Sequence, residues 1–173
     1  MFSPELLREL YQHMEWADAK VWRAVPRGSP ADHRLLEWLV HIHVVQRAFL
    51  HVWTGRTVEE AFRNPEDFAA VDDVSAWAQA YYPEAHAFID AVTDQQLREP
   101  VVMPWAAQLS ETLGRPPGIT TLGHTCFQVT SHTTHHRGQV NARLRELGAE
   151  PPLVDYIGWV WFGKPAPDWK ATV

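Results

Sequence analysis

The sequence predicts an all-α fold, a bundle of four long helices followed by a short C-terminal helix at about residues 155–161. Two observations support this prediction. Apolar residues recur at intervals of three and four in four separate segments, and capping residues or Gly and Pro stops bracket these segments. The chain contains no internal repeat and no long linker, so we expect one domain over residues 1–173.

Three of the long helices are expected at about residues 4–25, 32–54 and 121–147. Ser3 and Thr120 or Thr121 are suitable N-caps, and Gly55 and Gly148 are suitable C-terminal stops. The apolar stripe of the first helix is Leu6, Leu10, Met14, Ala17 and Val21, and that of the second includes Leu35, Leu39, Ile42, Phe49 and Trp53. Each stripe is wide enough to bury one face of its helix.

The third helix is expected at about residues 72–91, and Pro83 within it predicts a kink or an early break, because proline lacks the N–H donor of a helix interior. Residues 100–118 contain three further prolines and are expected to be irregular. Within them, Val101–Met103 could form a short strand.

Composition limits the classes of function. The formal net charge of −6 argues against nucleic acid as a partner, since phosphate binding needs a basic surface. The N-terminal residues do not resemble a signal peptide, and no apolar run approaches membrane-spanning length, so we expect a cytoplasmic protein with a small-molecule substrate and no membrane partner. The single cysteine, Cys126, excludes an internal disulfide and is expected to be a small core residue.

The fourth helix carries two histidines, His132 and His136, four residues apart. At about 100° per residue they lie about 40° apart on one face, the spacing that offers two imidazoles to one metal ion. The residue after His132 is Thr133, whereas the zincin motif has its general-base Glu there, so protease chemistry is disfavoured. Of the remaining histidines, surface or incidental positions are expected for His13, His33, His51 and His86.

A pair of histidines at this spacing is often only structural, but two features favour a metal site. The pair shares a face with Val129 and Val140, so we expect both side chains to face the inside of the bundle. His41, beside Trp38 and Val45, lies on the apolar side of the second helix. Three inward imidazoles would form an open three-nitrogen site, with one position left for water or substrate.

Four further residues that follow the histidine pair have expected roles, and two of them have alternatives. Gln139 lies about 20° from His132 and could orient a ligand imidazole or a metal-bound water, which is our candidate catalytic role. Asp155 could accept a hydrogen bond from a ligand imidazole or cap the terminal helix. Arg137 is expected to pair with an acidic group, and Gly138 to permit close helix packing.

The region from His132 to Tyr156 contains a specific pattern. It reads His-Thr-Thr-His-His-Arg-Gly-Gln at residues 132–139, followed by Leu144, Leu147-Gly148, Pro151-Pro152 and Asp155-Tyr156. With the second-helix segment Leu39-Val40-His41-Ile42 and with Trp16-Ala17, it resembles the DinB/YfiT-like superfamily over most of the chain. The sequence departs from many relatives at Gln46, where they carry Glu.

The resemblance implies an up-up-down-down four-helix bundle, often a homodimer, with a divalent metal ion held by three histidines. Carried over to this sequence, the ligands are His41, His132 and His136. Zinc, nickel and iron all suit imidazole nitrogen.

The resemblance leaves three hypotheses for function. The first is a metal-dependent S-transferase that activates a low-molecular-weight thiol such as bacillithiol or mycothiol. The second is a metal-dependent hydrolase of a small amide or ester, in which the same site activates water. The third is a stress-related metal-binding protein without catalytic activity.

Overall fold

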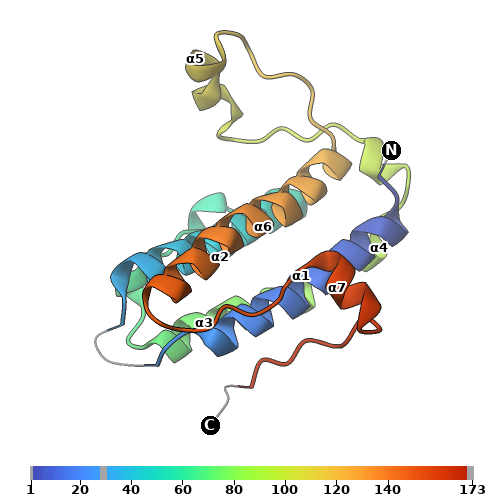
Figure 1. Ribbon diagram of the computed structural model, residues 1–173. Coiled ribbons are helices and arrows are strands. Elements are labelled where there is room, and N and C mark those ends of the chain that lie inside the picture. The colour runs from blue at the N-terminus through green and yellow to red at the C-terminus, as the bar shows by residue number, and fades with distance from the viewer. Residues whose placement is uncertain (1, 28–30, 171–173) are drawn as a thin grey trace.

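The computed structural model describes residues 2–27 and 31–170, and its regular elements are all helices (Figure 1). The α-helices are α1 (Pro4–Ala24), α2 (His33–Thr54), α3 (Val71–Gln79), α4 (Tyr82–Ala91), α5 (Ser110–Leu113), α6 (Leu122–Glu146) and α7 (Tyr156–Trp161). Short 3₁₀ turns are η1 (Val58–Ala61), η2 (Pro65–Asp67), η3 (Gln96–Arg98) and η4 (Ala106–Leu109). The all-α prediction is confirmed. Among these helices, none is both long and apolar enough to cross a membrane.

The expected strand at Val101–Met103 is wrong. In the described part of the chain this region forms only an isolated antiparallel bridge between Pro100 and Thr121. Pro100 and Pro104 flank Val101–Met103, and neither has an N–H donor. A ladder of backbone hydrogen bonds therefore cannot continue past either end of this segment. Val92, Leu97 and Met103 instead pack into the core at one end of the bundle, and the part of the region that carries η4 and α5 extends away from that end (Figure 1).

The helix ends follow the capping signals in the sequence. The Leu6 N–H donates to Ser3 Oγ at 3.2 Å at the start of α1. The Leu35 N–H donates to Asp32 Oδ1 at 2.8 Å at the start of α2, and Gly55 ends that helix with φ 66°, a conformation that favours glycine. The predicted bounds of these helices are therefore correct to within one or two residues.

The expected third helix is broken into two. α3 ends at Gln79 and α4 begins at Tyr82, so Pro83 lies in the first turn of α4. A proline in a helix interior would remove one hydrogen bond and clash with the carbonyl of residue 79, whereas in the first turn it costs nothing. Of the two predicted outcomes, the sequence adopts the break.

The helix directions correct one expectation. α1 and α2 run antiparallel, α3 and α4 run with α2, and α6 runs with α1, which is an up-down-down-up order rather than up-up-down-down (Figure 1). The contacts of Trp22 with His43 and of Asp18 with Gln46 set the direction of α2 against α1. Those of His43 with Trp77 and of Trp53 with Phe88 set α3 and α4 along α2. Those of Tyr11 with Cys126 and of Asp18 with Arg137 set α6 along α1. The connection between α1 and α2 is short, and a short connection reverses the chain direction.

Two apolar clusters fill the two ends of the bundle. The first contains Leu7, Tyr11, Phe49, Tyr81, Ile89 and Val129 with their neighbours, and the second contains Trp22, Leu35, Leu39, Val74, Val140 and Leu144 with theirs. Between them lies a layer of buried polar side chains, which we call the polar layer and which consists of Asp18, Gln46, Tyr82, Thr133 and Arg137. Its members come from α1, α2, α4 and α6, so it joins all four walls of the bundle.

Asp18 is the centre of the polar layer. Arg137 donates to its Oδ1 through Nε at 3.0 Å and Nη2 at 2.8 Å, and both side chains are almost fully buried. Tyr82 Oη and Gln46 Nε2 donate to its Oδ2, the latter at 3.1 Å. Burial alone would raise the pKa of Asp18, but the charge of Arg137 and these hydrogen bonds outweigh it and hold the pKa below its ordinary value.

His43 fixes the orientation of Gln46. Trp22 Nε1 donates to His43 Nε2 at 3.0 Å, so His43 Nδ1 is the protonated nitrogen and donates to Gln46 Oε1 at 2.7 Å. Burial lowers the pKa of His43, which favours this neutral form. With its oxygen engaged, Gln46 directs its Nε2 to Asp18 and, at 3.2 Å, to Thr133 Oγ1.

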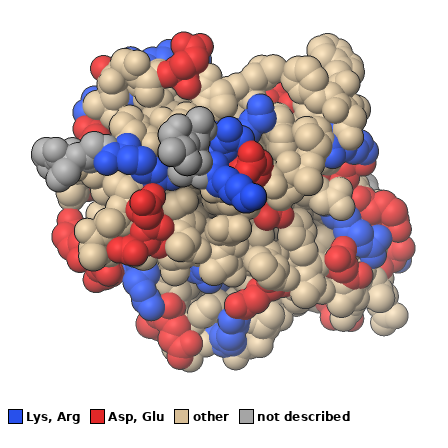
Figure 2. Space-filling view, turned by 90° about the horizontal axis from the view of Figure 1, so that it is seen from below, with Lys and Arg blue, Asp and Glu red and all other residues tan. Residues whose placement is uncertain are grey.

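Acidic and basic side chains are interspersed on the face shown in Figure 2. Several form exposed ion pairs between distant segments, such as Arg23 with Asp168 and Lys164 with Glu9. Both pairs hold the C-terminal tail on α1.

Candidate metal centre

The structure brings together the three histidines that the sequence singles out. His41 lies on α2 and His132 and His136 lie one turn apart on α6, the helix that runs antiparallel beside it. One ring nitrogen from each lies within 4.8 Å of those from the other two. The ring of His41 is centred 5.1 Å from that of His132 and 4.6 Å from that of His136. Such a group could hold a metal ion.

The histidines lie at the rim of the α2–α6 interface rather than on the inner face that we expected. His41 is exposed, and His132 and His136 are half-buried. The buried stripe of α6 is Cys126, Val129, Thr133, Arg137, Val140 and Leu144. Each α6 histidine directly precedes a member of this stripe, so its side chain is turned about 100° away from the core. The site is therefore accessible from solvent.

The surroundings of His132 and His41 favour the neutral imidazole, which has the free electron pair that a metal ion needs. Burial, then the nearby His136 and His41, lower the pKa of His132 to about 4. Burial and His136 also lower the pKa of His41. The Nδ1 atom of His132 is buried and has no hydrogen-bond partner among the described residues. A bound cation would satisfy this nitrogen, so the donor set fits a divalent metal ion.

Gln139 holds one of these imidazoles in place. His136 Nδ1 donates to Gln139 Oε1 at 2.6 Å, which leaves the His136 Nε2 atom with its lone pair. Hydrogen bonds of this kind fix the tautomer and the ring orientation of metal-binding histidines. The orienting contact that the sequence suggests for Gln139 is therefore present, and it is made to a candidate ligand.

Comparison with protein families identifies the family of this chain. The chain matches the DinB family over residues 1–166. It belongs to the DinB family. No curated protein sequence matches it. Family membership and the three-histidine group are both compatible with metal binding.

The polar layer explains how this DinB-family chain accommodates Gln46. The Gln46 amide donates to the Asp18 carboxylate, which a Glu side chain could do only if it were protonated. An ionised Glu here would place a second negative charge beside Asp18, with Arg137 as the one cation of the polar layer. The sequence alone gave no sign that Asp18 and Gln46 are buried partners, because both residue types are usually exposed.

Other residues of the DinB-family chain lie outside the three-histidine group. Asp155 stands at the N-cap position of α7, but its side chain makes no capping hydrogen bond, and it does not belong to the three-histidine group. Cys126 is buried as expected, and burial raises the pKa of its thiol to about 12. His13 and His51 are buried rather than at the surface, where their ring nitrogens bond to the carbonyls of Val154 and Thr57.

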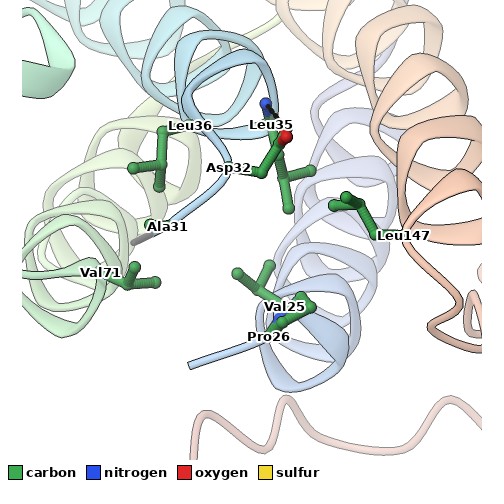
Figure 3. Close-up of a pocket in the computed structure, with 8 residues that line it drawn as sticks. All are labelled: Val25, Pro26, Ala31, Asp32, Leu35, Leu36, Val71 and Leu147. Carbon is green, nitrogen blue, oxygen red and sulfur yellow. Dashed lines mark hydrogen bonds between the residues drawn. The ribbon is translucent and has the colours of Figure 1, made fainter. Parts of the chain in front are cut away.

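Two hollows flank α2. The one in Figure 3 lies at the end of the bundle, is mostly apolar, and is lined by Val25, Pro26, Ala31, Asp32, Leu35, Leu36, Val71 and Leu147. Its one carboxylate, Asp32, is already paired with Arg143 at 2.7 Å. The other hollow, of about 400 Å³, includes His41 and lies between α2 and residues 62–66. It is the space that adjoins the candidate metal centre.

Gly138 does not serve the close helix packing that we expected. A Cβ atom built there would meet nothing within 4 Å. We therefore expect Gly138→Ala to raise the free energy of unfolding by about 0.5–1 kcal/mol, because alanine loses less backbone entropy in a helix interior. Urea unfolding of the two proteins measures the difference. A lower stability of the variant would show that the glycine has a packing role after all.

Proposed function

We propose that this protein binds a divalent metal ion through His41, His132 and His136 and catalyses the transfer of a low-molecular-weight thiol to a small electrophile. The main support is the convergence of three imidazoles at a solvent-accessible rim, where burial lowers the pKa of His132. A divalent ion held by three protein ligands keeps a position open for an external molecule and lowers the pKa of a thiol or water that occupies it.

The lack of a general base favours a thiol over water as the nucleophile. In the described chain, no Asp or Glu belongs to the three-histidine group, and Thr133 stands where the zincin motif has Glu. An ordinary thiol has a pKa of about 8.5 and ionises readily, whereas water, with a pKa of about 15.7, depends far more on assistance. Cys126 is buried and its pKa is about 12. The reacting thiol must therefore come from a cosubstrate.

The chain's own residues have distinct tasks in this reaction. Burial keeps His132 neutral at physiological pH. Gln139 holds His136 with its Nε2 atom free. Val44 and Phe62 line the hollow beside His41, where the apolar part of an electrophile would lie. In the transfer, the thiol loses its proton to solvent, its sulfur bonds to the electrophilic carbon, and the leaving group departs with its bonding electron pair.

Elemental analysis of protein purified without an affinity tag is the first test. We expect about one divalent ion per chain, lost in His41→Ala and His132→Ala. The matched control is His135→Ala, because His135 is an exposed neighbour of His136 that does not belong to the three-histidine group. Loss of metal from this control as well would contradict the assignment of the ligands.

Turnover is then measured with 1-chloro-2,4-dinitrobenzene and several ester and amide substrates, with and without added thiol. We expect conjugate formation that needs both the thiol and the metal and that fails in His132→Ala. Hydrolysis independent of thiol would replace the transferase proposal with the hydrolase alternative. A metal-loaded, folded protein that turns over nothing would support the non-enzymatic alternative.

A further inference from the structure

Residues 106–118, which we call the arm, extend from one end of the bundle and carry η4 and α5 (Figure 1). In Figure 1 the arm runs back above α6, and its tip stands clear of that helix. Neither η4 nor α5 contains a buried residue. Among the elements of the described chain, α5 makes more than slight contact only with η4. A helix of one turn is unstable in water by itself, so a further packing surface would stabilise the tip.

The tip of the arm has an apolar face. Leu109 and Leu113 lie four positions apart, about one helical turn, so their side chains lie on the same side of the tip. Both are more than half exposed. The residues between them, Ser110–Thr112, are polar. Because the burial of a leucine side chain is strongly favourable, this face is suited to cover an apolar molecule.

The base of the arm, in contrast, is fixed on the bundle. On one side Met103 is buried, and the ring of Trp105 packs edge-on against that of Phe49 on α2, with the ring centres 5.2 Å apart. On the other side the carbonyl of Thr120 accepts a hydrogen bond from the Val101 N–H at 2.8 Å. The arm is therefore anchored at both ends, while its tip is not held.

The anchor lies on the same seam of the bundle as the three histidines. Phe49 follows His41 by eight positions, which is about 12 Å along α2. Around α2, at about 100° per residue, Phe49 lies between His41 and Trp53. Trp53 Nε1 donates to Thr125 Oγ1 on α6 at 3.0 Å, so this side of α2 faces α6. Trp105 thus lies along the α2–α6 seam, about two helical turns from His41.

The arm is long enough to reach the metal centre. Leu113 follows Trp105 by eight positions, and a helical rise of about 1.5–2.0 Å per residue gives a span of about 12–16 Å. This span matches the distance of about 12 Å along α2 between the anchor and His41. A swing of the arm about its base would therefore bring both leucines over the three-histidine group, which is open to solvent at His41.

From these observations we infer that the arm is a lid, whose Leu109 and Leu113 close over the three histidines and hold an apolar electrophile beside them. The inference rests on the proposed function, since it names the part of the chain that selects the electrophile. Closure would exclude water from the rim, where hydrolysis of the electrophile competes with transfer of the thiol. The two leucines would then favour apolar electrophiles over polar ones.

NMR with a paramagnetic ion tests the closure. The full chain is loaded with copper(II), which broadens nearby backbone amide signals, and the zinc-loaded chain is the reference. The ligand is 1,3-dinitrobenzene, an unreactive analogue of the electrophile. We expect the ligand to increase the broadening at Leu109 and Leu113 but not at Val102 or Ile119, which flank the base of the arm.

The outcomes separate this inference from the proposed function. If the metal binds and the tip signals remain unaffected both with and without the ligand, the lid is overturned while the metal centre stands. If the chain binds neither copper nor zinc, the proposed function is overturned, and the lid with it.

Variants then test the role of the two leucines. Leu109→Ser/Leu113→Ser should weaken the binding of 1,3-dinitrobenzene by at least about 10-fold and leave the metal content unchanged. Val102→Ser/Ile119→Ser is the matched control, because these exposed apolar residues lie at the base, and it should bind normally. Equal binding by the two double variants would contradict the inference. A dimer that sedimentation detects, and that dissociates in the tip variant, would show that a second copy covers the leucines and would overturn the lid.

Discussion

Asp18→Ala is expected to lower the free energy of unfolding by about 3–5 kcal/mol, because it leaves the guanidinium of Arg137 buried without its counter-charge. The substitution also removes the acceptor used by Tyr82 and Gln46, so three helices lose a shared partner. Urea unfolding at neutral pH measures the loss. Asp168→Ala is the matched control, since its ion pair with Arg23 is exposed and should contribute no more than about 1 kcal/mol.

The double variant Asp18→Leu/Arg137→Leu separates two explanations of such a loss. If the cost comes from an unpaired buried charge, removing both charges should recover most of the stability, because apolar residues often replace a buried ion pair without loss. If the hydrogen bonds of the polar layer carry the stability instead, the double variant should be as unstable as the single one. A loss below about 1 kcal/mol in Asp18→Ala would refute both explanations.

The second large effect is expected from metal binding. A divalent ion at about 100 times its dissociation constant should raise the free energy of unfolding by about 2.7 kcal/mol, because it binds the folded chain in preference to the unfolded one. For a chain of this length the Tm should rise by roughly 5–10 °C. Differential scanning fluorimetry with zinc or nickel, and reversal by a chelator, measure the effect.

The candidate ligands should differ sharply from their neighbours in this assay. His41→Ala should show no metal-dependent rise in Tm, whereas His135→Ala should show the full rise. Gln139→Leu should need about 10–100 times more metal for the same rise, since it removes only the bond that orients His136. A full rise in His41→Ala would mean that the metal binds elsewhere.

The features that the sequence predicts well are those with a local cause. Ser3, Asp32 and Gly55 mark helix ends through contacts with residues three or four positions away, so the helix bounds are close to those observed. The pairing of His132 with His136 is likewise local, and His41 followed from its place beside Trp38 and Val45 on the second helix, to which the resemblance to a known family added support. These residues account for the whole three-histidine group.

The features that the sequence misses depend on contacts between distant segments. Val129 and Val140 suggested that the α6 histidines face inward, but the buried stripe also contains Thr133 and Arg137, which sequence patterns assign to the surface. Arg137 can be buried only because Asp18 lies opposite on α1. A residue 119 positions away along the chain leaves no local signal.

The bond between Gln46 and Thr133 has a consequence for metal exchange. It ties α2 to α6 next to the positions from which both helices present histidines, and it forms when the chain folds. The conformational entropy cost of bringing the three ligands together is therefore incurred when the chain folds and not when it binds the ion. A metal ion would bind a preformed set of ligands, and its dissociation would leave the bundle folded. Small zinc domains, in contrast, unfold without their metal. The protein could thus exchange one metal ion for another within its native state.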